Sequence, residues 1–158
     1  MRIRDVMTTT PTCCLPDDNA SKAARIMKDL NTGIVPVMEN GQSSRLVGVV
    51  TDRDLCLEII AEGRDPRTMK VKDCMTSKVI ACEPDDDVQK VMALMRDNQI
   101  RRIPVVDKQN VIQGIVSMAD LMQRMELGSA ETQQTLKKVT EPTKEASKPR
   151  AESFRKSA

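Results

Sequence analysis

The chain contains no histidine, tryptophan or tyrosine, and its only aromatic residue is Phe154. Histidine is the most common general base and the most common metal ligand, so its absence argues against most hydrolases and metalloenzymes. Proteins that bind single-stranded nucleic acids usually provide aromatic rings on which the bases stack, and these rings are missing here. The apolar core must therefore be built from aliphatic side chains and from the eleven methionines.

Other marks of enzymes and of secreted proteins are missing too. The five cysteines are odd in number and form no Cys-x-x-Cys pair, so the sequence predicts neither a zinc site nor a complete disulfide framework. It has no glycine-rich phosphate loop and no evident pair of acid and base, which argues against an enzyme. No apolar run is long enough for a signal peptide or a membrane span. We expect a cytoplasmic protein with reduced thiols that does not act at a membrane.

What the chain does contain is an internal repeat. The run Ile3–Thr8 returns 68 positions later as Val71–Thr76, and the run Gly48–Leu55 returns at an offset of 66 as Gly114–Leu121. Between them, Pro16-Asp17-Asp18 matches Pro84-Asp85-Asp86, Met27 matches Met95, and Val35-Pro36-Val37 matches Ile103-Pro104-Val105. Two like units usually pack face to face across a pseudo-two-fold axis, so the cleft on that axis is where we expect a site.

The repeat also divides the chain. A unit of about 55 to 60 residues would bury too little apolar surface to be stable alone, so the two units must share a core. We predict a first unit at 1–63, a polar linker with a proline at 64–70 and a second unit at 71–128. In 129–158 the apolar periodicity fades and Lys, Glu, Thr, Ser and Pro dominate, which predicts a basic, disordered tail.

Each unit is predicted to have the order β-α-β-β-α. Helices are indicated where apolar residues recur on one face, at Ala20, Ala23, Ala24, Met27 and Leu30 and again at Val88, Val91, Met92 and Met95. Strands are indicated at 34–38, 46–51, 102–106 and 111–117, with short extended pieces at 12–15 and 79–82. The last helix of the first unit runs from about Asp52 to Gly63, and that of the second unit ends before Gly128.

One motif occurs at the end of a strand in both units. A glycine, two aliphatic residues and a hydroxyl residue (Thr51 or Ser117) are followed three positions later by an aspartate (Asp54 or Asp120). These side chains fall in the first turn of a helix, where unpaired amide groups favour an anion. The hydroxyl group can bind a phosphate, and the carboxylate can accept hydrogen bonds from a ribose diol. The alternative is that both motifs are ordinary capping boxes, which serve only the helix.

The repeated motifs resemble a tandem pair of cystathionine-β-synthase (CBS) domains, the arrangement called a Bateman module. The resemblance runs from Met1 to about Leu127 and includes the Met-Thr motif, the Pro-Asp-Asp helix start, the Val-Pro-Val strand and both Gly-x-x-Thr/Ser-x-x-Asp signatures. It is strongest to small stand-alone bacterial members of the family, which share the run Val49–Leu55. It implies an α+β fold in which two CBS units, each β-α-β-β-α, pack by their sheets around a pseudo-two-fold axis.

The resemblance further implies that the cleft between the units binds an adenine nucleotide (AMP, ADP or ATP) or a related adenosyl compound as a regulatory ligand, with no cofactor required. Asp54 and Asp120 would bind ribose hydroxyls, and Thr51 and Ser117 would hold phosphate or ribose oxygens. Backbone groups near Thr12 and Ile80 would read the edge of the base. The apolar slot around the base would be formed by Ile34, Pro36, Val79, Ile80 and Ile103.

The units differ in charge just before the Ile/Val-Pro-Val strand. Arg101 and Arg102 stand there in the second unit, at positions where the family often places phosphate contacts, while the first unit has Thr32–Val35 in this stretch. Guanidinium groups are strong phosphate ligands, and Arg53 beside the hydroxyl residue could compensate in the first unit. Alternatively, the arginine pair is a solvated strand edge that pairs with Asp97 or Asp107 and contributes little to stability.

Two functions remain open. In the first, the protein is a non-catalytic regulatory module that binds an adenosine-containing small molecule and modulates an unidentified partner protein in trans. In the second, it is a structural or interaction dimer with an empty cleft that acts through its surface or its C-terminal tail. For both, we expect a homodimer formed through helices around Leu55–Ile60 and Leu121–Met125, and neither involves nucleic acid.

Overall fold

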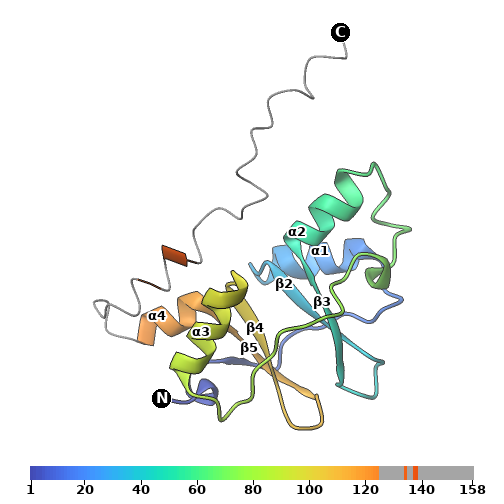
Figure 1. Ribbon diagram of the computed structural model, residues 1–158. Coiled ribbons are helices and arrows are strands. Elements are labelled where there is room, and N and C mark those ends of the chain that lie inside the picture. The colour runs from blue at the N-terminus through green and yellow to red at the C-terminus, as the bar shows by residue number, and fades with distance from the viewer. Residues whose placement is uncertain (125–133, 135–136, 139–158) are drawn as a thin grey trace.

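The first repeat folds around a β-hairpin, because two short runs of β-branched residues flank a polar turn. In this computed structural model, residues 1–124, 134 and 137–138 are described. Strands β2 (Ile34–Met38) and β3 (Leu46–Thr51) pair antiparallel. Helix α1 (Ala20–Asp29) precedes the hairpin, and α2 (Asp52–Leu55) follows it and continues as a π-helical turn at Cys56–Ile60. These elements lie together on one side of the molecule (Figure 1).

The second repeat has the same order of elements. Helix α3 (Val88–Asn98) is followed by the antiparallel strands β4 (Arg102–Val106) and β5 (Ile112–Ser117) and by α4 (Met118–Arg124). The four predicted hairpin strands are therefore present within one residue of their predicted bounds. The predicted end of the last helix and the tail at 129–158 lie outside the described residues, apart from residues 134 and 137–138. No helix in the described part of the chain is long and apolar enough to cross a membrane.

The predicted first strand of each unit is reduced to a single bridge. Cys14 pairs in parallel with Val37, and its equivalent Cys82 pairs in parallel with Val105.

The apolar face predicted for α3 is correct, whereas the one predicted for α1 is partly wrong. All four apolar residues predicted on α3 are buried. On α1, Ala20, Ala23 and Met27 are buried, but Ala24 is exposed and Leu30 is 55% exposed, so the predicted apolar face is too wide there.

The first segment of each repeat packs on the other repeat. Ile3 is fully buried in the core of the second unit, among Met92, Met95 and neighbouring residues. In the same way, Val71 and Cys74 belong to the core of the first unit. The short strand β1 (Thr8–Thr9) pairs antiparallel with β5 of the second unit, which gives the sheet order β1-β5-β4. The two units thus exchange their leading segments, which the repeat pattern alone does not predict.

A third cluster of buried residues joins the two units. Ile34, Leu46 and Val49 of the first unit meet Val106 of the second, with Ile112 and other partly buried residues packed against them. Next to this cluster, Arg45 and Val111 form an antiparallel bridge. These two residues are equivalent at the offset of 66, so their bridge lies on the pseudo-two-fold axis. The expected shared core is therefore present between the sheets.

Candidate functional site

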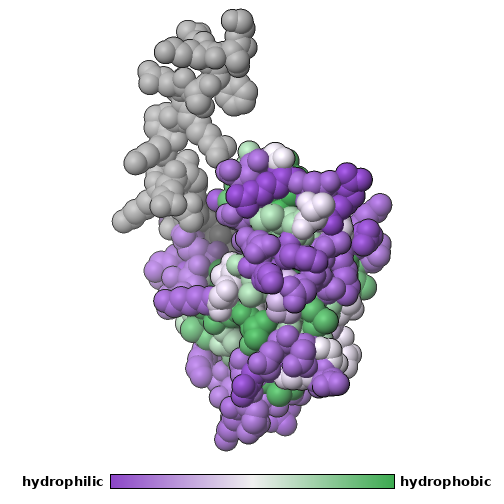
Figure 2. All heavy atoms as spheres, turned by 90° about the vertical axis from the view of Figure 1, so that its right-hand side faces the viewer, coloured by the Kyte–Doolittle hydropathy of each residue, from purple (hydrophilic) through white to green (hydrophobic). Residues whose placement is uncertain are grey.

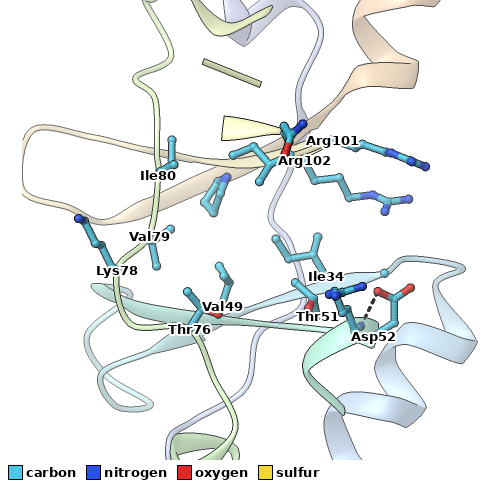
Figure 3. Close-up of a pocket in the computed structure, with 15 residues that line it drawn as sticks. Ile34, Val49, Thr51, Asp52, Thr76, Lys78, Val79, Ile80, Arg101 and Arg102 are labelled. Atoms are coloured by element: carbon cyan, nitrogen blue, oxygen red, sulfur yellow. Dashed lines mark hydrogen bonds between the residues drawn. The ribbon is translucent and has the colours of Figure 1, made fainter. Parts of the chain in front are cut away.

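A cavity of about 500 Å³ lies between the two units (Figure 3). The first unit lines it with the start of β2 and with the junction of β3 and α2, and the second unit lines it with residues 78–80 and 99–102 and with Pro104. In Figure 3, Ile34 and Thr51 lie on one side of the cavity, and Arg101 and Arg102 lie on the other. The volume is within the range of about 300–1,000 Å³ that is typical of small-molecule sites.

The structure brings together some of the predicted site residues and separates others. Those that line the cavity are Ile34, Thr51, Arg53, Val79, Ile80, Arg101 and Arg102. Those that do not line it are Thr12, Pro36, Asp54, Ile103, Ser117 and Asp120.

Ile103 illustrates the physical reason. Successive side chains of a strand point to opposite faces, so Arg102 and Pro104 line the cavity while Ile103 is buried in the core of the second unit.

Several lining residues were not predicted from the sequence. They are Gly33, Val49, Asp52, Thr76, Lys78, Gln99, Ile100 and Pro104. Some carried a usable signal: Lys78 directly precedes the predicted Val79, and Pro104 is the repeat equivalent of the predicted Pro36. The sequence shows both copies of a position, but the fold decides which copy faces the cavity.

The strand-to-helix junction beside the cavity is a capping box. The amide of Thr51 donates to Asp54 Oδ2 at 2.8 Å, and the amide of Asp54 donates to Thr51 Oγ1 at 3.1 Å. The second unit repeats this, with Ser117 N to Asp120 Oδ2 at 2.8 Å and Asp120 N to Ser117 Oγ at 3.2 Å. The capping interpretation of both motifs is therefore realised in the structure. It leaves Asp54 Oδ1 without a hydrogen-bond partner among the described residues.

The cavity is rich in unpaired positive charge. Arg53, Lys78, Arg101 and Arg102 line it, and none of these side chains forms a hydrogen bond or an ion pair within the described ranges. The surface pairing that the sequence left open is absent for the arginine pair. Asp97 instead pairs with Arg96 at 2.9 Å, and that contact holds the pKa of Asp97 below its usual value. Among the described residues, Asp52 supplies the only carboxylate that lines the cavity.

The rest of the cavity wall is aliphatic. Ile34, Val49, Val79, Ile80 and Ile100 supply apolar surface that can hold a flat base without aromatic stacking. Ile80 also offers polar groups, because its backbone N–H and C=O form no hydrogen bond with other described residues. The site thus combines an apolar slot, a free amide group and unpaired cations, which are the chemical groups that a nucleotide requires.

The sequence matches the CBS domain family twice, over residues 3–61 and 71–127. The chain belongs to the CBS domain family. Its relative YlbB of Bacillus subtilis is 45% identical over 121 residues, which cover 76% of this chain and 79% of YlbB. The two units described above are therefore CBS units, and the α+β arrangement expected from the sequence is confirmed.

Solved structures share the arrangement of this CBS pair. The crystal structure of Hypoxic Response Protein I with two coordinated zinc ions has a TM-score of 0.71 and 27% identity, and covers 79% of this chain and 99% of that one. The CBS pair of protein MJ0100, in complex with 5′-methylthioadenosine and S-adenosyl-L-methionine, has a TM-score of 0.69 and 24% identity, covering 78% and 94%. In the described part of the present chain, no group of three or more His, Cys, Asp or Glu residues could hold a metal ion.

The equivalent cysteines Cys14 and Cys82 are packed rather than activated. Cys14 and Cys82 are buried, and burial raises the pKa of Cys14 to about 11 and that of Cys82 to about 12. The negative charges of Asp18 and Asp86 raise the pKa values of Cys14 and Cys82, respectively, further. A thiol with such a pKa is protonated at neutral pH and is a poor nucleophile. Neither residue lines the cavity, so both act as small core residues of their CBS units.

Proposed function

We propose that the protein is a non-catalytic regulatory module that binds an adenine nucleotide or a related adenosyl compound between its CBS units and modulates a partner protein in trans. The observation that carries this proposal is the cavity itself, in which an aliphatic slot meets four cations that have no partner in the described part of the chain. The base would lie between Ile34 and Val79, with its edge on the backbone of Ile80, and the phosphates would lie on the arginines. The fold is shared with a CBS pair that carries adenosyl ligands.

A ligand screen tests this function. We expect at least one of AMP, ADP, ATP, S-adenosylmethionine and 5′-methylthioadenosine to raise the melting temperature, since a ligand at a hundredfold its Kd stabilises the folded state by about 2.7 kcal/mol. The measurement is thermal unfolding, followed by calorimetric titration of each compound that gives a shift. Cytidine and its phosphates serve as controls for non-specific anion binding. If no adenosyl compound shifts the transition, the proposed function is wrong.

The aspartate of the capping box has a testable second role. Asp54 caps α2 through Oδ2, and we propose that its free Oδ1 binds the ribose. Asp54→Ala is then expected to lose about 0.5–2 kcal/mol of stability through the cap. It should also weaken ligand binding by about tenfold through the lost charge-assisted hydrogen bond. Calorimetry at a temperature where the variant is folded measures the second effect.

Asp87 provides the matched control for this prediction. It caps α3 by accepting a hydrogen bond from Gln89 N at 2.9 Å. Neither aspartate lines the cavity, but Asp54 directly follows the lining residue Arg53, whereas no lining residue is adjacent to Asp87 in the chain. Asp87→Ala should therefore lose a cap without losing affinity. Equal affinities of the two variants would show that Asp54 is only a cap. Asp120→Ala applies the same test to the equivalent motif of the second CBS unit.

We also propose a homodimer, which the exposed apolar residues at the helix ends of the first unit support. Leu30 is 55% exposed, Leu57 44% and Ile60 73%. Figure 2 views the molecule from the side of α1 and α2 and shows a face that is mostly hydrophilic, with a hydrophobic band across its middle. The dimer surface predicted around Leu121–Met125 is not part of this proposal, because Leu121 is fully buried and Met125 lies outside the described residues. If the cavity binds nothing, this surface supports the alternative of an interaction dimer.

A further inference from the structure

We infer that the cavity is a polyphosphate site, which selects an adenine nucleotide with at least two phosphates, and that each chain holds one such ligand. The inference rests on the proposed function and adds to it the charge class and the stoichiometry of the ligand. Two independent observations carry it. The first is the charge of the cavity wall, and the second is how that charge is divided between the repeats.

The charge balance of the cavity favours a multiply charged anion. The lining residues Arg53, Lys78, Arg101 and Arg102 are opposed, within the described ranges, by one carboxylate, that of Asp52. Cations without protein partners bind phosphate groups strongly, and arginine can do so through two parallel hydrogen bonds. The same positive charges disfavour binding of S-adenosylmethionine, whose sulfonium group is positive, and they add no electrostatic attraction for uncharged adenosine.

The cations are not spread evenly around the cavity. In Figure 3, Arg101 and Arg102 extend towards the side where Asp52 lies, and Lys78 lies at the opposite end. Both groups lie beside Gly33, where a Cβ atom would be 3.1 Å from Arg102 Nη1 and 2.8 Å from Asp52 Oδ2. The guanidinium group from the second unit therefore reaches the start of α2 in the first unit. We place the phosphates at this end.

The repeat predicts that the other half of the cleft lacks this property. By the offsets of 68 and 66, the four cations Lys78, Arg101, Arg102 and Arg53 correspond to Thr10, Gly33, Ile34 and Ala119. None of these equivalents is charged. The half of the cleft at Ser117 therefore has a backbone equivalent to that of the cavity, but it lacks the four cations. A polyphosphate thus has one place to bind in each chain.

Calorimetric titration without added Mg²⁺, so that the phosphates keep their full charge, tests the inference. We expect affinity to increase in the order adenosine, AMP, ADP, ATP, with S-adenosylmethionine weaker than ATP and one ATP bound per chain. The affinity for ATP should fall steeply with salt, because the interaction is between charges. Tight binding of adenosine or S-adenosylmethionine at the level of ATP, or two equal ATP sites per chain, would overturn the inference but leave the proposed function intact. Binding of no adenosyl compound would remove both.

Three variants locate the phosphates. Arg102→Ala is expected to weaken ATP binding by about tenfold or more while leaving adenosine unchanged, since a guanidinium contact to phosphate is charge-assisted. Lys78→Ala, which removes a cation at the opposite end, should have a clearly smaller effect on ATP. Asp52→Asn should strengthen ATP binding, a gain that a folding defect cannot produce. Equal losses in Arg102→Ala and Lys78→Ala, or no gain in Asp52→Asn, would contradict this placement.

Discussion

Ile3→Ala is expected to lower the free energy of unfolding by about 2–5 kcal/mol, the range for removing a buried large aliphatic side chain. Ile3 is fully buried although it is the third residue of the chain, because it enters the core of the second CBS unit. Its neighbours are held there by the backbone, since Ile3 N donates to Asp86 O at 3.1 Å and Arg4 N donates to Pro84 O at 3.0 Å. Urea unfolding of the full chain measures the change.

Ile60→Ala is the control for this prediction. It removes the same atoms from a side chain that is 73% exposed, so the free energy of unfolding should change little when it is measured at a protein concentration at which the chain is monomeric. Val71, the repeat equivalent of Ile3, is fully buried in the core of the first unit. Val71→Ala should therefore also destabilise the protein. If Ile3→Ala behaved like Ile60→Ala, the exchange of leading segments would not contribute to the stability of the fold.

Gly114→Ala is expected to destabilise the protein by about 1–3 kcal/mol, the usual cost of overpacking a close contact. A Cβ atom at Gly114 would lie 2.6 Å from the carbonyl oxygen of Thr8 and 3.0 Å from Met7 Sδ. The first of these atoms is backbone, so relief requires β1 to move away from β5, with which it pairs. Hydrogen exchange of the β1 amides, together with urea unfolding, would report this movement.

Substitutions at two other glycines serve as comparisons for the destabilisation expected of Gly114→Ala. At Gly48, the repeat equivalent, the closest atom to a Cβ would be Met75 Sδ at 2.7 Å, with the backbone oxygen of Thr76 at 3.1 Å. A flexible methionine can shift, so Gly48→Ala should cost less. At Gly41 there is nothing within 4 Å, and Gly41→Ala should be nearly neutral. Equal stability of Gly114→Ala and Gly41→Ala would show that the pairing of β1 with β5 tolerates a side chain.

The local sequence pattern was sufficient to predict most of the secondary structure. The hairpin strands follow from runs of β-branched residues, and the starts of α2, α3 and α4 follow from capping residues, both of which act over a few neighbouring positions. Helix α1 begins after Asn19, whose side chain forms no capping hydrogen bond. The wrong predictions at Leu30 and at the leading strands have local causes as well. Leu30 is the C-cap residue, which follows the last residue of α1, and it is exposed. The pieces around Cys14 and Cys82 are held by one bridge each and are too short to form strands.

The residues that line the candidate site were harder to predict from the sequence. Thr51 and Asp54 belong to one motif, yet the first lines the cavity and the second serves the helix cap. Asp52, between them in the chain, lines the cavity although it belongs to neither signature position. Which of three adjacent side chains faces a cavity depends on the orientation of the helix against the other unit. That orientation is set by contacts between residues far apart in the chain.

The amino-acid sequence by itself determined the duplication, the order of helices and strands in each unit, the CBS family and the difference in charge between the repeats, because each of these is carried by residue identity and short-range spacing. Only the tertiary structure decided that the leading segments exchange partners, that Ile103 belongs to a core and Pro104 to the cavity, and that Arg102 meets the start of α2 across Gly33. These features arise from packing the two units against each other, where burial of apolar surface selects one mutual orientation.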